Sequence, residues 1–211
     1  MKYWLKSNQF WLVALTGLIV GISNYWLDNI MLLLPATQVQ MLFAPAPIYI
    51  AMGIVPAIWL GLYMDGNRNL TWATARRSTR MLDGMFLCGA LLPLAAAVIV
   101  LYCLKVNSLG CLQDSLLFVG LVLIGHRLVP NGYATAWPII WIFGASLLGR
   151  THLDGYFGSQ AWAFILDSMP TSDGWIISTV VFVLGLLLIS NSQRLWFPKL
   201  TATTKLFKNI N

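Results

Sequence analysis

The chain has 211 residues, of which 58% are apolar and only 9% are charged. Charged residues make up about a quarter of an average soluble domain, so this composition excludes an ordinary soluble enzyme or binding module. The formal net charge of +6 could indicate nucleic acid or anionic lipid as a partner, but the positions of the basic residues favour membrane topology as its cause.

The apolar segments predict transmembrane helices. A bilayer core of about 30 Å needs roughly 20 apolar residues per helix, which leaves room for about six spans and no separate soluble domain. We expect spans at residues 9–27, 41–63, 82–104, 115–129, 133–149 and 175–190. No small-x-small cleavage site follows the first, so we interpret it as a retained span and not as a signal peptide. Spans four and five are short, and that pair could be partly re-entrant.

The second predicted span contains Pro45, Pro47 and Pro56. Proline removes a backbone donor and kinks a helix, and lipid tolerates this only where neighbouring protein satisfies the freed carbonyl. Pro56 therefore predicts a bent span that is packed in protein. Pro45 and Pro47 are equally consistent with a segment that leads into the helix.

A strongly charged segment at residues 65–83, DGNRNLTWATARRSTRMLD, separates spans two and three. It holds Arg68, Arg76, Arg77 and Arg80, four of the thirteen Lys and Arg residues. Two interpretations stay open: an anchor on anionic lipid, or a short cytoplasmic helix that binds a partner protein. Trp72 favours the second, since Trp and Arg dominate many protein interfaces. We expect no nucleic-acid binding, because the segment is short and adjoins the bilayer.

The segment between spans five and six, residues 150–174, contains a predicted short helix at 159–168. Its residues Trp162, Ile165 and Leu166 share one helical face, a pattern typical of a helix that lies in the membrane interface. Pro170 is expected to end it.

The basic residues fall mostly on one side of the membrane in the predicted topology. With the N-terminus in the cytoplasm, eleven of the thirteen Lys and Arg residues fall inside and only Lys105 and Arg150 fall outside, as the positive-inside rule requires. Five of the seven aspartates fall outside, namely Asp28, Asp114, Asp154, Asp167 and Asp173. The prediction is an all-α polytopic membrane protein: one transmembrane domain over residues 1–211, six spans, both termini cytoplasmic, in the cell (inner or plasma) membrane.

Chemistry-bearing motifs are absent from the sequence. No acid or base is expected in the middle of a span, which argues against a proton-coupled transporter. No GxxxxGK[ST], HExxH or GxSxG motif occurs, and His152 with Asp154 supplies too few ligands for a metal. We interpret His126 as an interfacial anchor. We therefore expect no enzyme activity, no catalytic or metal site and no cofactor.

Two spans, the arginine-bearing turn RNLTWATARRSTR and a third span resemble the permease subunits of six-helix, type-2-like ABC exporters. In that family the segment between the second and third helices is a coupling helix that contacts the ATPase, and short extracellular helices lie between the fifth and sixth spans. The resemblance implies a separate ATP-binding subunit, a second membrane subunit and an amphipathic or peptide-like cargo. It assigns ATPase contact to Arg68, Trp72, Arg76, Arg77 and Arg80, and deformation of span two to the kink at Pro56.

This chain departs from the family in two ways: the helix expected ahead of span one is reduced to MKYWLKSNQ, and the usual glutamate is missing because the chain has no Glu. Two other functions stay open. One is a substrate-binding membrane subunit of a vitamin-type uptake system. Such subunits present small-x-x-x-small helix faces, and Gly17 and Gly21 match that pattern. The other is a non-transporting immunity or scaffold subunit of a membrane complex.

Overall fold

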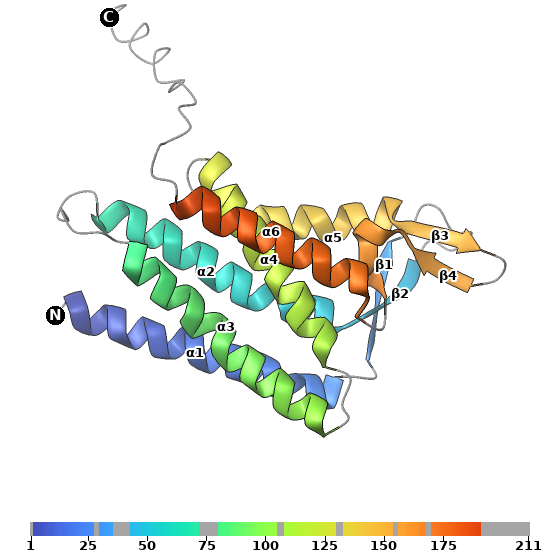
Figure 1. Ribbon diagram of the computed structural model, residues 1–211, viewed down its shortest axis with the longest axis horizontal. Helices are drawn as coiled ribbons and strands as arrows, with labels where there is room; N and C mark the ends of the chain where they lie inside the picture. The colour runs from blue at the N-terminus through green and yellow to red at the C-terminus, as the bar shows by residue number, and fades with distance from the viewer. Residues whose placement is uncertain are drawn as a thin grey trace, which may run out of the picture.

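Helices that run back and forth along one axis dominate the computed structural model, which describes residues 2–27, 30–35, 43–71, 80–104, 108–129, 133–153, 156–167 and 170–190. Within these residues successive α-helices run in opposite directions (Figure 1). They are α1 (Lys2–Leu27), α2 (Tyr49–Thr71), α3 (Arg80–Cys103), α4 (Leu109–Leu128), α5 (Ala136–Leu148) and α6 (Ser172–Ser190). The short 3₁₀ helices η1 (Tyr133–Thr135) and η2 (Ala161–Leu166) precede α5 and α6.

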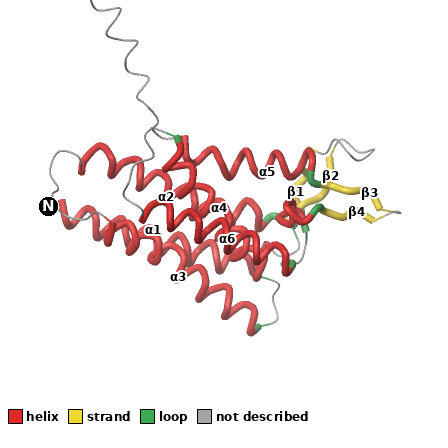
Figure 2. Tube along the Cα trace, turned by 45° about the horizontal axis from the view of Figure 1, so that its top comes forward, coloured by secondary structure: helices red, strands yellow, loops and turns green. Residues whose placement is uncertain are grey.

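Two antiparallel hairpins lie together at one end of the helices (Figures 1 and 2). In the first, β1 (Met31–Pro35) pairs with β2 (Phe43–Pro47), with Met31 opposite Pro47. In the second, β3 (Arg150–Leu153) pairs with β4 (Tyr156–Ser159). We call this the hairpin end. The opposite end, where α1 and α3 begin and α2 and α4 finish, is called the basic end.

The hairpin β1–β2 corrects the expected start of the second span. Residues 43–47, FAPAP, form a strand, and the helix begins only at Tyr49. Proline cannot donate to a strand ladder and is confined to positions such as edge strands, and each strand of a two-stranded sheet has a free edge. Pro45 and Pro47 thus belong to the segment that leads into α2, whereas Pro56 lies inside the helix and is buried.

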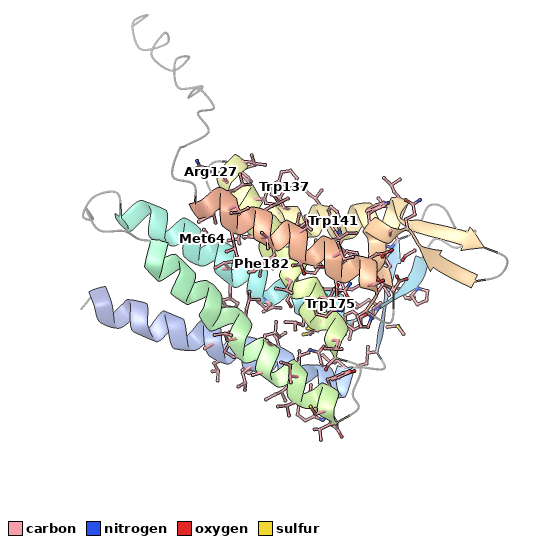
Figure 3. The ribbon with its side chains drawn as sticks, viewed as in Figure 1. Met64, Arg127, Trp137, Trp141, Trp175 and Phe182 are labelled. Carbon is pink, nitrogen blue, oxygen red and sulfur yellow. The ribbon has the colours of Figure 1, made fainter. Side chains whose placement is uncertain are left out.

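The helix α4 occupies the centre of the fold. It packs chiefly on α6 and α2 and to a lesser extent on α3 and α5, whereas α1 packs chiefly along α3. Small residues allow the close approach: a Cβ added to Gly120 would lie 2.8 Å from the Cα of Phe182 in α6. Figure 3 shows Phe182 on the α6 ribbon beside α4. Interfaces of this kind hold two backbones together without large side chains.

Large apolar side chains lie on the outside of the fold as well as in its interior. Large apolar side chains are exposed along α1, α3, α5 and α6, among them Leu15, Ile19, Leu92, Ile99, Ile140, Phe143, Ile176 and Leu187. In α4, by contrast, Leu128 is the one large apolar residue exposed among those described. A helix that is apolar on all sides is typical of a buried or membrane-spanning segment.

Two of the described helices, Leu109–Leu128 and Ser172–Ile189, are long and apolar enough to cross a membrane. Further apolar stretches of the described residues are shorter: Ala14–Leu27, Tyr49–Leu62, Leu91–Cys103 and Tyr133–Leu148. These findings give weak support to a membrane location, because the core helix of a soluble protein can meet the same criteria. The fold is mostly helical, and the two hairpins depart from the predicted all-α class.

Several predicted boundaries differ from those observed. The fourth helix begins at Leu109 and not at residue 115, so it is 20 residues long and not short. The predicted helix at 159–168 is the shorter η2, and its residues Phe164, Ile165 and Leu166 are buried against the bundle and do not face outward. Trp162 anchors η2 on α5 through an edge-to-face contact with Trp141, with ring centroids 6.0 Å apart.

Candidate functional site

The predicted ATPase-contact residues lie partly outside the described residues. Arg68 is in the last turn of α2 and Arg80 is the first residue of α3, so both helices extend into the charged segment. Trp72, Arg76 and Arg77 fall within residues 72–79, which are not described. Both described positions are at the basic end, where α2 ends and α3 begins (Figure 1).

The acidic side chain of Asp114 lies inside α4, contrary to its predicted place in an outer loop. Its exposed fraction is 1%, and its Oδ2 atom has no hydrogen-bond partner among the described residues. The Asp114 Cβ lies 3.1 Å from where a Cβ of Gly53 in α2 would be, so the missing side chain of Gly53 makes room for it. Asp114 is the sixth residue of α4, so it lies in the second turn of the helix and not in the loop expected at 105–114.

Polar neighbours of Asp114 come from α4 and α1. Cys111 is one turn earlier on the same face of α4, is fully buried, and interacts with the side chains of Asn24 and Ser115. The Ser115 hydroxyl donates to the Cys111 carbonyl at 2.7 Å, and the Asn24 amide donates to the Val20 carbonyl at 3.0 Å. Asn24, Cys111, Asp114 and Ser115 together form what we call the buried polar site.

A second set of polar groups faces α6 and the hairpin end. Gln113 is 2% exposed, and its Oε1 atom has no hydrogen-bond partner among the described residues. The Ser178 hydroxyl of α6 is also buried and also has no hydrogen-bond partner among them. Closer to the hairpins, the Tyr49 hydroxyl of α2 donates to the Asp167 carbonyl after η2. The Ser159 hydroxyl donates to Asp167 Oδ2 at 2.7 Å. These bonds fix η2 across the end of α2.

The ionisable groups of the buried polar site are the Asp114 carboxyl and the Cys111 thiol. The described residues contain no group of three or more His, Cys, Asp or Glu that could hold a metal ion. A buried carboxyl group inside an apolar helix is rare and costly, and in membrane proteins such a group marks a pathway for ions, protons or substrate. No family model, curated protein or solved structure matches the chain.

The sequence contained one sign of this site. The spacing of Cys111, Asp114 and Ser115 puts all three on neighbouring positions of a helical face, once the segment LGCLQD is assigned to a helix. Gly110 shows why it can be helical there: the Tyr49 ring lies where a side chain of Gly110 would be, with its Cζ 2.8 Å from the added Cβ. That long-range packing contact is not visible in the sequence.

Proposed function

We propose that this chain is the membrane-spanning subunit of an ATP-driven transporter that exports an amphipathic or peptide-like cargo. A separate ATPase chain would bind at the segment 68–80, and a second membrane subunit, either another copy or a related chain, would complete the transport path. The observation that carries the proposal is the concentration of basic residues at one end of the helices.

Among the Lys and Arg residues in the described ranges, five lie toward the basic end and only Arg150 lies at the hairpin end. The five are Lys2, Lys6, Arg68, Arg80 and Arg127. This is the asymmetry expected when the basic end faces the cytoplasm. It supports a topology in which the connection between α2 and α3 is cytoplasmic, where an ATPase can reach it.

The exposed apolar residues of α1, α3, α5 and α6 support burial of these helices in lipid. Soluble monomers rarely expose contiguous apolar patches larger than a few hundred Å², and a bilayer would cover such a surface on all sides. Six crossings with both termini in the cytoplasm follow if each α-helix spans once, because successive helices alternate in direction.

The connection between α2 and α3 suits a coupling role. Residues 72–79 join two helices that both extend to the basic end, so a force applied there would be transmitted directly to α2 and α3. The chain has no Walker motif, so ATP would have to be bound by another chain. Pro56 lies in α2 between this connection and the hairpin end and is a position where the helix could bend.

The test is a mild-detergent affinity purification of the tagged chain and of Arg76→Glu/Arg77→Glu, followed by mass spectrometry. We expect an ATPase to copurify with the unmodified chain and to be lost from the variant, because charge reversal replaces attraction with repulsion at the interface. Lys205→Glu/Lys208→Glu is the matched control: it makes the same charge change on the same predicted side of the membrane and should leave the ATPase bound.

The absence of an ATPase from the unmodified sample would overturn the exporter proposal in favour of a scaffold or immunity subunit. Loss of the ATPase from both variants would contradict the assignment of the coupling surface to Arg76 and Arg77, since it would mean that any reduction of cytoplasmic charge has this effect.

A further inference from the structure

The carboxyl group of Asp114 is buried, and its Oδ2 atom accepts no hydrogen bond from the part of the chain that the structure describes. The titratable groups near it are Cys111 on its own helix and, toward the hairpin end, Tyr49 of α2 with Asp167 beyond it. From α1 the neutral side chain of Asn24 reaches Cys111. His126 and Arg127, the basic residues of α4, lie more than three turns further along the helix, at its other end.

The buried polar site lies where two groups of helices meet. α1 and α3 pack chiefly on each other, while α2, α5 and α6 gather around α4, and Figures 1 and 2 both place the α1–α3 pair along one side. Asn24 comes from the first group, and Cys111 and Asp114 come from the second. Polar contacts cross the same boundary at Ser108, which donates to the Val98 carbonyl of α3 at 3.1 Å, and at Ser23, which lies 3.8 Å from the Met52 sulfur.

A carboxylate in apolar surroundings without a partner costs many kcal/mol, so such a group is neutralised. Two neutralising partners are chemically available: a proton, which needs no space, or a cation, which needs a cavity. In the structure described here the Asp114 side chain is packed against Gly53 and is almost fully buried. The closed packing therefore favours the proton.

We propose that Asp114 is an exchange site, which carries a proton in this closed conformation and binds the cationic group of an apolar cargo when the α1–α3 pair parts from α2 and α4. The inference rests on the proposed transport function and specifies its cargo as an amphipathic cation. In the exchange the O–H bond of Asp114 breaks, the proton passes to water, and the carboxylate forms an ion pair with the arriving cation. One positive charge leaves for each that binds.

The experiment measures binding of tetraphenylphosphonium, an apolar monovalent cation, to the full-length chain in phosphatidylcholine nanodiscs. This neutral lipid is used because anionic lipid would bind the probe itself. We expect saturable binding whose affinity rises about tenfold per pH unit over the range where the free carboxyl is protonated. In weak buffer, binding should release one proton per cation. The neutral analogue triphenylphosphine oxide should not bind in this way.

Asp114→Asn keeps the shape of the side chain but cannot ionise, so it should weaken cation binding at least about tenfold, as expected for the loss of one charge pair. Asp173→Asn is the matched control, because it makes the same substitution at an exposed residue of α6. It should bind as the unmodified chain does.

Three results would each overturn the proposal: no binding to the unmodified chain, equal binding by folded Asp114→Asn, or binding without proton release. The proton measurement uses the unmodified chain and therefore stands even if the variant does not fold. The assay needs no ATPase, so failure of the purification experiment and failure of this one can be told apart.

Discussion

Two helical glycines occupy opposite environments. A Cβ on Gly120 would lie 2.8 Å from both the backbone nitrogen and the Cα of Phe182, whereas a Cβ on Gly144 would meet no atom within 4 Å. Backbone atoms cannot rotate out of the way, so a methyl group at Gly120 has to separate α4 from α6.

We predict that Gly120→Ala lowers the free energy of unfolding by about 1–3 kcal/mol, the usual cost of overpacking a core. Gly144→Ala is the control and should be neutral or stabilising by up to about 1 kcal/mol, since alanine favours a helix more than glycine does. The midpoint of thermal unfolding in detergent, followed by tryptophan fluorescence, measures both. A stable Gly120→Ala protein would contradict the close contact between α4 and α6.

At the same residue scale, local chemistry predicted Pro56 inside a helix and allowed Pro45 and Pro47 to precede it. It did not predict the position of Asp114. Lys105 and Gly110 precede Asp114, and that pattern indicates a loop. The helical alternative is stable because Tyr49 and Gly53 of α2 fit closely against α4. Burial of a polar group depends on contacts far apart in the sequence, and these are not encoded in any one segment.

At the scale of elements, a hydrogen bond from the Tyr49 hydroxyl to the Asp167 carbonyl joins α2 to the residue that follows η2. A single intramolecular hydrogen bond contributes about 0.5–1.5 kcal/mol, and loss of one partner leaves the other unsatisfied. Asp167 also closes the last turn of η2, because its backbone amide donates to the Phe164 carbonyl at 3.0 Å.

We predict that Tyr49→Phe speeds hydrogen exchange of the η2 amides by up to about tenfold, because local opening there no longer breaks this bond. Amides in the middle of α4 should keep their exchange rates. Tyr133→Phe is the control, since Tyr133 is 68% exposed. Unchanged exchange in η2 after Tyr49→Phe would mean that other contacts, such as Trp162 on Trp141, hold η2 in place.

The existence of each long helix was predictable from apolar runs, because burial or lipid contact requires them. The residues at which the helices begin and end were less predictable. α2 starts late because FAPAP forms a strand, and α4 starts early because glycines at 110 and 53 admit close neighbours. The two hairpins were missed, since neither MLLLP nor RTHL alternates in the way that predicts a strand.

For the whole molecule, the positive-inside rule predicts that the basic end faces the cytoplasm and the hairpin end faces the outside of the cell. We predict that an impermeant maleimide added to intact cells labels Thr151→Cys in β3, whereas Ser78→Cys is labelled only after lysis. Both are made in a background with Cys88, Cys103 and Cys111 replaced by alanine. Labelling of Ser78→Cys in intact cells, or of neither site before lysis, would contradict the proposed topology.

The hairpin β1–β2 also restricts how α1 can move. It joins the end of α1 to the start of α2, and the Ile48 amide adds a bond to the Ile30 carbonyl at 3.1 Å. If α1 pivots there as a rigid lever, its 26 residues give an arm of about 39 Å, and Asn24 lies only about 5 Å from the pivot. A gap of about 8 Å at the basic end would then widen the boundary beside Asn24 by only about 1 Å, too little for water. Such a pivot leaves Asp114 dry, so water reaches it only through a movement that also releases the hairpin end.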